Sequence, residues 1–128
     1  MARVLRNHEW FIESDDLDLA HVDGTLQISG HLTCSSGRLL GVWKRLLVQS
    51  RDGVLYVRTI RYSYEAFHAG RCLFRYDNAH PHPGHPDEHH KHVFDASGGE
   101  QVIWLGRDRW PYLSDALEEL AQWSAASL

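Results

Sequence analysis

The chain has 128 residues, which is enough for one domain with a hydrophobic core and too few for two domains of ordinary size. Its hydrophobic content of 43% is that of a globular protein, and no run of about 18 apolar residues is present that could cross a membrane. The N-terminal segment meets acidic residues too early to form the apolar stretch of a signal peptide, so we expect a cytoplasmic protein.

The net charge of −4 conceals an uneven distribution of charge along the chain. Residues 38–75 carry eight basic and two acidic side chains, whereas the segments before and after them are both acidic. A basic middle favours a cationic face that binds a polyanion such as nucleic acid. The alternative is that these arginines lie solvated on the outer face of a sheet, because clustering in sequence need not be clustering in space.

The middle of the chain has the pattern of an antiparallel β-meander, over about residues 25–106. Residues 26–33 alternate apolar and polar side chains, as a half-buried strand does. Arg51-Asp52-Gly53 predicts a hairpin between two β-rich runs, residues 38–49 and 54–66. Shorter strands are expected at residues 71–77, 91–95 and 101–105.

The two ends of the chain differ from this middle. Residues 10–12 are a candidate edge strand, and from about residue 110 to 125 the apolar residues change to helical spacing, with Asp108 as a candidate cap and Pro111 in the first turn. The apolar stripe of this helix consists of Leu113, Ala116, Leu117, Leu120, Ala121 and Ser124. We therefore predict a single α+β domain: a curved antiparallel meander of five to six strands with a C-terminal amphipathic helix packed on one face.

Residues 74–92 are the most informative part of the sequence for function. Three prolines and a glycine exclude regular helix or central strand from most of this segment. Imidazole exchanges a proton near neutral pH and is a common metal ligand. The segment holds six of the ten histidines, which are His80, His82, His85, His89, His90 and His92.

An extended backbone would place the polar groups at both ends of this segment on shared faces. Arg75 and Asp77 would be neighbours on one face at its start, and His90 and His92 would share a face at its end. Two imidazoles with cations and a carboxylate can cleave RNA without a metal: one imidazole accepts the proton of the 2′-hydroxyl, the other protonates the leaving oxygen, and the cations stabilise the phosphorane. The candidate catalytic residues are Arg75, Asp77, His82, His90, Lys91 and His92.

The same residues are compatible with other interpretations. Zinc or a similar divalent cation could be bound by ligands drawn from this segment, although no metal-binding spacing such as H-E-x-x-H is present. A disordered tract without catalytic meaning is a further alternative. We favour a site without a cofactor, and the alternative metal ligands are Asp77, His82, His85, His90 and His92.

The longest predicted strand carries a second candidate binding surface. Tyr62, Tyr64 and Arg58 share one face of the strand, so aromatic and basic groups alternate there and could stack and hold bases. The alternative is a core face whose phenol groups reach water.

Three blocks of sequence resemble the TumE family of small bacterial toxins, which are usually encoded beside a helix-turn-helix antitoxin. These blocks are YSYEAF (62–67), FRYDNAHPHP (74–83) and HHKH (89–92). The chain departs from the family pattern at Glu65, where a histidine is common, at residues 79–82, which permute P-H-H, and at Glu88, which replaces a proline. The resemblance points to Arg75, Tyr76, Asp77, Asn78, His89, His90, Lys91 and His92, with His80 or His82 as the equivalent of the family's intervening histidines.

The resemblance and the residues together predict the toxin of a toxin–antitoxin pair that cleaves RNA without a metal and is shut off by an antitoxin protein. The alternatives are a non-enzymatic module that binds metal or nucleic acid, and a metal-dependent hydrolase. Self-association of the chain into a homo-oligomer is a further possibility. The residues expected to contact the RNA are Arg58, Arg61, Tyr62, Tyr64, Tyr76, Asn78, His80 and His89.

Overall fold

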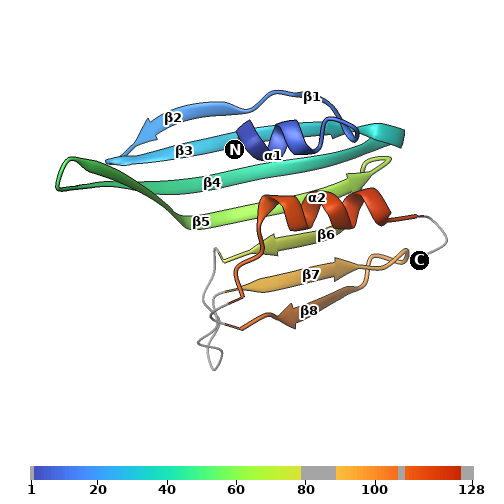
Figure 1. Cartoon of the computed structure of the whole chain (residues 1–128). Helices are drawn as coiled ribbons and strands as arrows, with labels where there is room; N and C mark the ends of the chain where they lie inside the picture. The colour runs from blue at the N-terminus through green and yellow to red at the C-terminus, as the bar shows by residue number, and fades with distance from the viewer. Residues whose placement is uncertain (1, 79–88, 107–108, 125–128) are drawn as a thin grey trace.

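A computed structural model describes residues 2–78, 89–106 and 109–124 of the chain. Within these residues, eight strands form one curved antiparallel sheet, and two α-helices lie against the same face of it (Figure 1). None of the helices described is long and apolar enough to span a membrane. The elements are, in chain order, α1 (Ala2–Asn7), β1 (Ile12–Asp15), β2 (Asp18–Val22), β3 (Thr25–Cys34), a 3-10 turn (Ser35–Gly37), β4 (Arg38–Arg51), β5 (Val54–His68), β6 (Arg71–Asp77), β7 (His90–Phe94), β8 (Glu100–Trp104) and α2 (Leu113–Gln122).

The predicted meander is confirmed. Strands β3 to β8 pair antiparallel, each with the next one along the chain. The strand count is higher than predicted, because β1 and β2 both add to the outer edge of β3, one after the other. These two segments are short and mostly exposed, so they lack the apolar alternation that reveals a half-buried strand. Backbone hydrogen bonds to β3 are enough to hold them.

The hydrophobic core lies between the sheet and helix α2. Residues directly opposite one another in successive strands, such as Leu32, Leu40 and Ala66, face the helices and are buried. The predicted helical stripe meets them, and each leucine buried in this way contributes about 1.5–3 kcal/mol. The buried residues of this stripe are Leu113, Ala116, Leu117 and Leu120.

Helix α2 begins later than the sequence predicts. The N-cap is Tyr112, whose backbone N–H donates to a carboxylate oxygen of Asp115 at 2.7 Å, and this bond satisfies a donor at the helix start. Pro111 therefore precedes the helix instead of occupying its first turn. The predicted cap Asp108 lies outside the described residues.

The sheet has a helix-covered face and an open face, and strand register decides which residues share the open face. Residues directly opposite in an antiparallel pair point to the same side, and alternate residues of a strand point to opposite sides. One row across the open face consists of Trp43, Ser63, Asp77, His90 and Trp104. The neighbouring row consists of Gly41, Glu65, Arg75, His92 and Val102.

Candidate active site

The β6–β7 pair brings together four residues that the sequence singles out. Asp77 ends β6 directly opposite His90, which begins β7, and Arg75 lies directly opposite His92. The side chains that were expected to share a face before the histidine-rich segment and those expected to share a face after it therefore meet on the same face of the sheet. We refer to Arg75, Asp77, His90 and His92 as the Asp77 cluster.

The carboxylate of Asp77 is the centre of this cluster. Arg75 donates from Nε to Oδ2 of Asp77 at 2.9 Å, and Nδ1 of His90 lies 3.3 Å from the other oxygen, Oδ1. Nε2 of His92 also lies 3.3 Å from Oδ2. The side chains of Asp77, His90 and His92 are 5%, 0% and 9% exposed, whereas that of Arg75 is 32% exposed. Arg75 is therefore the member that meets solvent most directly.

The electrostatics keep Asp77 ionised. Burial alone would raise the pKa of this carboxyl group, but the hydrogen bonds with His90 and Arg75 and the charge of His92 outweigh burial and lower the pKa below its ordinary value. At neutral pH Asp77 is thus a carboxylate that accepts on both oxygens. A carboxylate in this position selects the His90 tautomer that carries hydrogen on Nδ1 and leaves the lone pair on Nε2.

Two residues of β8 complete the surroundings of the histidines. Glu100 places Oε1 2.5 Å from Nδ1 of His92, so both ring nitrogens of His92 face carboxylate oxygens. Both contacts are hydrogen bonds only in the imidazolium form. The ring of Trp104 meets His90 edge-on, with centroids 4.6 Å apart. Sequence reasoning missed Glu100 and Trp104, because only the β7–β8 register brings them here.

Lys91, a predicted catalytic residue, is not part of the cluster. It lies directly opposite Tyr76 on the helix-covered face, and both side chains contact Glu119 of α2. Nζ of Lys91 is 2.8 Å from Oε2 of Glu119, and the Tyr76 hydroxyl donates to Oε1 at 2.6 Å. Because β alternation separates Lys91 from His90, the structure does not place its ammonium beside a phosphate held by the cluster.

Asn78 and His89 lie buried at the base of the histidine-rich segment. Asn78 accepts from the backbone N–H of Tyr62 at 2.9 Å and donates to the carbonyl of Ile60 at 3.1 Å. Nδ1 of His89 lies 2.8 Å from the Tyr62 hydroxyl, and its ring packs against Trp110 with centroids 4.2 Å apart. These contacts anchor the strand ends from which Asp77 and His90 project.

The aromatic residues that the sequence places on one face of β5 lie on the helix-covered face, within the hydrophobic core. Tyr62 and Tyr64 are buried, and burial raises the pKa of both phenols, so they stay neutral. Their rings line a pocket of about 460 Å³ together with Lys44, Arg58, Thr59, Trp110, Pro111 and Tyr112. This pocket and the Asp77 cluster are on opposite faces of the sheet.

The single cationic face expected from the charge distribution is not formed. By register, Arg45, Arg61 and Arg75 project from the open face. Arg38 and Lys44 project from the helix-covered face, where Arg38 donates to the backbone carbonyl of Trp123. The basic residues of the middle segment are therefore divided between the two faces.

The cluster also has the ligand types of a metal site. Asp77, His90 and His92 each offer one ligand atom, and these three atoms lie within 4.8 Å of one another. Two imidazole nitrogens and a carboxylate oxygen suit a zinc-like divalent cation. The other predicted ligands and contacts, His80, His82 and His85, lie outside the described residues.

Comparison with known proteins identifies the family of the chain. Neither the curated proteins nor the solved structures contain a protein that matches the chain. A protein-family model described as "Toxin TumE" matches residues 1–124, nearly the whole sequence, including every residue of the Asp77 cluster. The chain therefore belongs to the TumE family of toxins.

Proposed function

We propose that this protein cleaves RNA without a metal ion, using the Asp77 cluster as its catalytic centre. Its family makes it the toxin component of a toxin–antitoxin system. The observation that carries the proposal is that one ionised carboxylate, Asp77, contacts two imidazoles and a guanidinium on the face of the sheet that no described helix covers.

Each member of the cluster has a chemical role in this proposal. His90, with Nδ1–H directed at Asp77, accepts the proton of the ribose 2′-hydroxyl on Nε2. His92, whose two nitrogens both face carboxylates, is the imidazolium that protonates the leaving 5′-oxygen. Arg75 uses Nε on Asp77, so its terminal nitrogens are the ones that meet the phosphate. Burial strengthens these interactions, because few water molecules compete for them.

The antitoxin has a corresponding place in the proposal. A helix-turn-helix antitoxin would cover the open face next to Arg75, the most exposed member of the cluster, and so prevent RNA from reaching it. The helix-covered face does not offer this route to inhibition, because α2 already occupies it.

The test is RNA cleavage by the purified toxin in EDTA, with analysis of the product ends. We expect fragments with 2′,3′-cyclic phosphate ends, and a rate that falls by about 10²–10⁴-fold in His90→Ala and in His92→Ala. The matched control is His21→Gln, which changes an exposed histidine on β2 and should leave the rate unchanged. Full-rate cleavage by His90→Ala, with correctly folded protein, would refute the proposal.

A metal-dependent hydrolase is the second candidate, and the spacing of the three ligand atoms favours it. A divalent cation would take the place of the direct contacts from His90 and His92 to Asp77 and activate a water molecule. In that case EDTA abolishes cleavage, and elemental analysis finds about one equivalent of metal that Asp77→Ala loses. RNA binding without cleavage under either condition would instead indicate a non-enzymatic binding module.

A further inference from the structure

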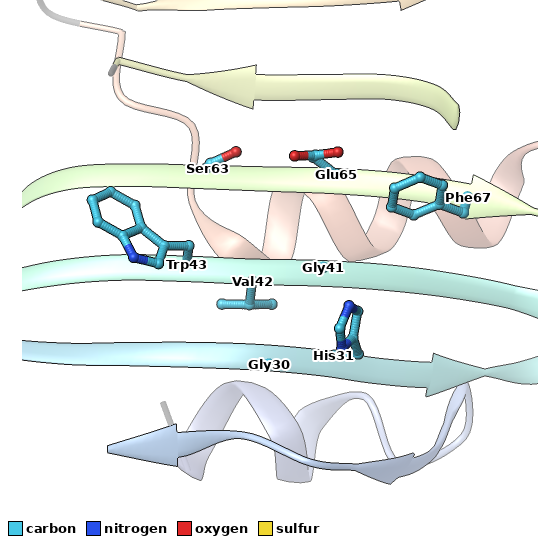
Figure 2. Close-up of a pocket in the computed structure, with 8 residues that line it drawn as sticks. All are labelled: Gly30, His31, Gly41, Val42, Trp43, Ser63, Glu65 and Phe67. Atoms are coloured by element: carbon cyan, nitrogen blue, oxygen red, sulfur yellow. The ribbon is translucent and has the colours of Figure 1, made fainter. Parts of the chain in front are cut away.

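A second concave site lies on the open face, beside the Asp77 cluster. It is a pocket of about 270 Å³ over strands β3, β4 and β5 (Figure 2). The lining residues that matter here are His31, Gly41, Trp43, Ser63, Glu65 and Phe67. Two of them touch the cluster's own strand: Ser63 lies directly opposite Asp77, and Glu65 lies directly opposite Arg75. A ligand in this pocket is therefore one strand away from the candidate catalytic groups.

Aromatic rings stand at the two ends of the pocket. Figure 2 shows Trp43 at one end and Phe67 at the other, with Glu65 between them. Both rings are partly exposed, so their faces are available for stacking. The guanidinium of Arg45 lies 5.8 Å from the centre of the Trp43 ring and supplies positive charge at that end.

The middle of the pocket is open because residue 41 is a glycine. Gly41 lies directly opposite both His31 and Glu65, so a side chain at this position would fill the space between them. A Cβ atom added there would meet its nearest neighbours at 3.7–3.8 Å, which is ordinary van der Waals contact. An alanine therefore fits at position 41. A larger side chain would fill the pocket, and the backbone conformation at this position allows one.

Glu65 supplies the carboxylate of this pocket. Its side chain is partly buried, and within the described residues its carboxylate has no hydrogen bond or ion pair. His31, on the other side of the pocket, directs Nδ1 to Asp16 at 3.4 Å and is held by that carboxylate instead. A partly buried carboxylate that lacks a donor is stabilised by a ligand that brings donors to it.

We propose that this pocket binds a guanine base of single-stranded RNA and so gives the toxin a preference for guanine, an inference that rests on the proposed cleavage of RNA. Guanine alone among the four bases offers two adjacent donors, N1–H and N2–H, and both can bond to one carboxylate. Adenine and cytosine present a lone pair beside a single donor, and uracil presents one donor between two carbonyl groups. Glu65 therefore selects guanine, while Trp43 and Phe67 contact the faces of the base.

The same register explains how the base and the scissile phosphate fit together. With guanine against Glu65, the attached ribose and phosphate reach Arg75 and Asp77, which are directly opposite Glu65 and Ser63. On the other side of Trp43, Arg45 and Arg61 lie directly opposite each other. The two guanidinium groups carry positive charge on the open face, and the next phosphate of the strand can bind to them there.

The experiment measures binding without cleavage. The probes are the single-stranded pentanucleotides UUGUU and UUAUU, made with 2′-O-methyl riboses so that no 2′-hydroxyl can attack. We expect the wild-type toxin to bind UUGUU more tightly than UUAUU, by on the order of tenfold. Glu65→Gln should remove this preference, because an amide presents one donor to guanine, whereas Glu13→Gln, on exposed β1, should keep it.

Two further variants test the pocket itself. Gly41→Val should weaken binding of UUGUU to the level of UUAUU, and Gly41→Ala should not. Equal affinity of the wild-type toxin for the two probes, or a preference retained by folded Glu65→Gln, would overturn the inference. A preference in binding with no cleavage of the unmodified RNA would instead count against the proposed function alone. Cleavage without any guanine preference would count against the pocket alone.

Discussion

His90 and Lys91 are neighbours in the chain, yet their side chains lie on opposite faces of the sheet. His90 contacts Asp77 on the open face, and Lys91 contacts Glu119 of helix α2 on the other. Lys91 also lies near the rings of Phe74 and Tyr76, so its ammonium is surrounded by groups that stabilise it in place. We therefore assign Lys91 to the attachment of α2 to the sheet.

The first prediction concerns this attachment. Lys91→Met keeps the aliphatic part of the side chain and removes the charge, so it should lower the free energy of unfolding by about 1 kcal/mol, since the pair with Glu119 is only partly buried. RNA cleavage should be nearly unchanged. Chemical denaturation and a cleavage assay measure the two effects, with Glu119→Gln as the matched variant. Loss of cleavage in a stable Lys91→Met protein would contradict this assignment and support a catalytic role for Lys91.

The second prediction concerns the centre of the cluster. Asp77→Asn preserves the size of the side chain but gives it one oxygen in place of two, so it can no longer accept from Arg75 and both imidazoles. Cleavage and toxicity should fall by about 10²-fold or more, since the imidazoles lose their orientation. Asp18→Asn, on exposed β2, is the control. Wild-type toxicity of Asp77→Asn would exclude a role for the carboxylate.

The third prediction is the effect of pH on stability. Because the pKa of Asp77 is lowered in the folded protein, its contribution to stability is complete above the ordinary value of 3.8 and is lost as the pH falls through the folded pKa below it. The free energy of unfolding should therefore decrease more steeply in acid for wild type than for Asp77→Asn. Urea denaturation between pH 6 and pH 2 measures this difference, and parallel pH profiles for the two proteins would contradict it.

How much of this site the sequence reveals depends on whether a contact is local. The alternation within residues 71–77 predicts that Arg75 and Asp77 share a face, and the same rule pairs His90 with His92. Their convergence follows once β6 and β7 are neighbours in a meander. Glu100 and Glu119 could not be assigned in this way, because their contacts with His92 and Lys91 depend on strand register and on helix docking. No short sequence pattern predicts the strand register or the docking of the helix.

The position of Glu65 also could not be predicted from the sequence. Sequence comparison marks it only as a departure from the family pattern, whereas register places it between the pocket over β4 and Arg75 of the cluster. The exposed strands β1 and β2 escaped prediction for a related reason, since an edge strand held by its backbone needs little apolar side chain. The position of Glu65 and the formation of β1 and β2 both depend on tertiary contacts and not on a local sequence pattern.

The fourth prediction concerns the two cysteines. Burial raises the pKa of the Cys34 thiol to about 11 and also raises that of Cys72, but Cys34 is fully buried and Cys72 is partly exposed. Since the thiolate is the reacting species, iodoacetamide at pH 8 should label Cys72 slowly and Cys34 only after unfolding. Mass spectrometry of peptides from native and urea-treated protein measures both sites, with Cys72→Ser as the control. Native labelling of Cys34 first would contradict the packing of β3.

The last prediction tests the anchor from which Asp77 projects. Asn78 supplies an acceptor to the backbone of Tyr62 and a donor to the backbone of Ile60, and it is 1% exposed. Asn78→Ala leaves the backbone N–H of Tyr62 without this partner, at a cost of about 1–3 kcal/mol if it stays buried. The cost at the Ile60 carbonyl is smaller, because this oxygen also accepts from Nη1 of Arg61 at 3.2 Å. The free energy of unfolding should fall accordingly.

Asn78→Asp separates the two hydrogen bonds, because it keeps the acceptor for the Tyr62 N–H and loses the donor to the Ile60 carbonyl. It adds a buried negative charge next to Asp77, which should also disturb the two imidazoles. We therefore expect Asn78→Ala to lose stability and to retain part of its cleavage rate at a temperature where it is folded, whereas Asn78→Asp should lose cleavage even there. Thermal unfolding and cleavage rates of the folded variants distinguish these outcomes. If both variants matched wild type in stability, the side chain would not be the link that holds the end of β6 to β5.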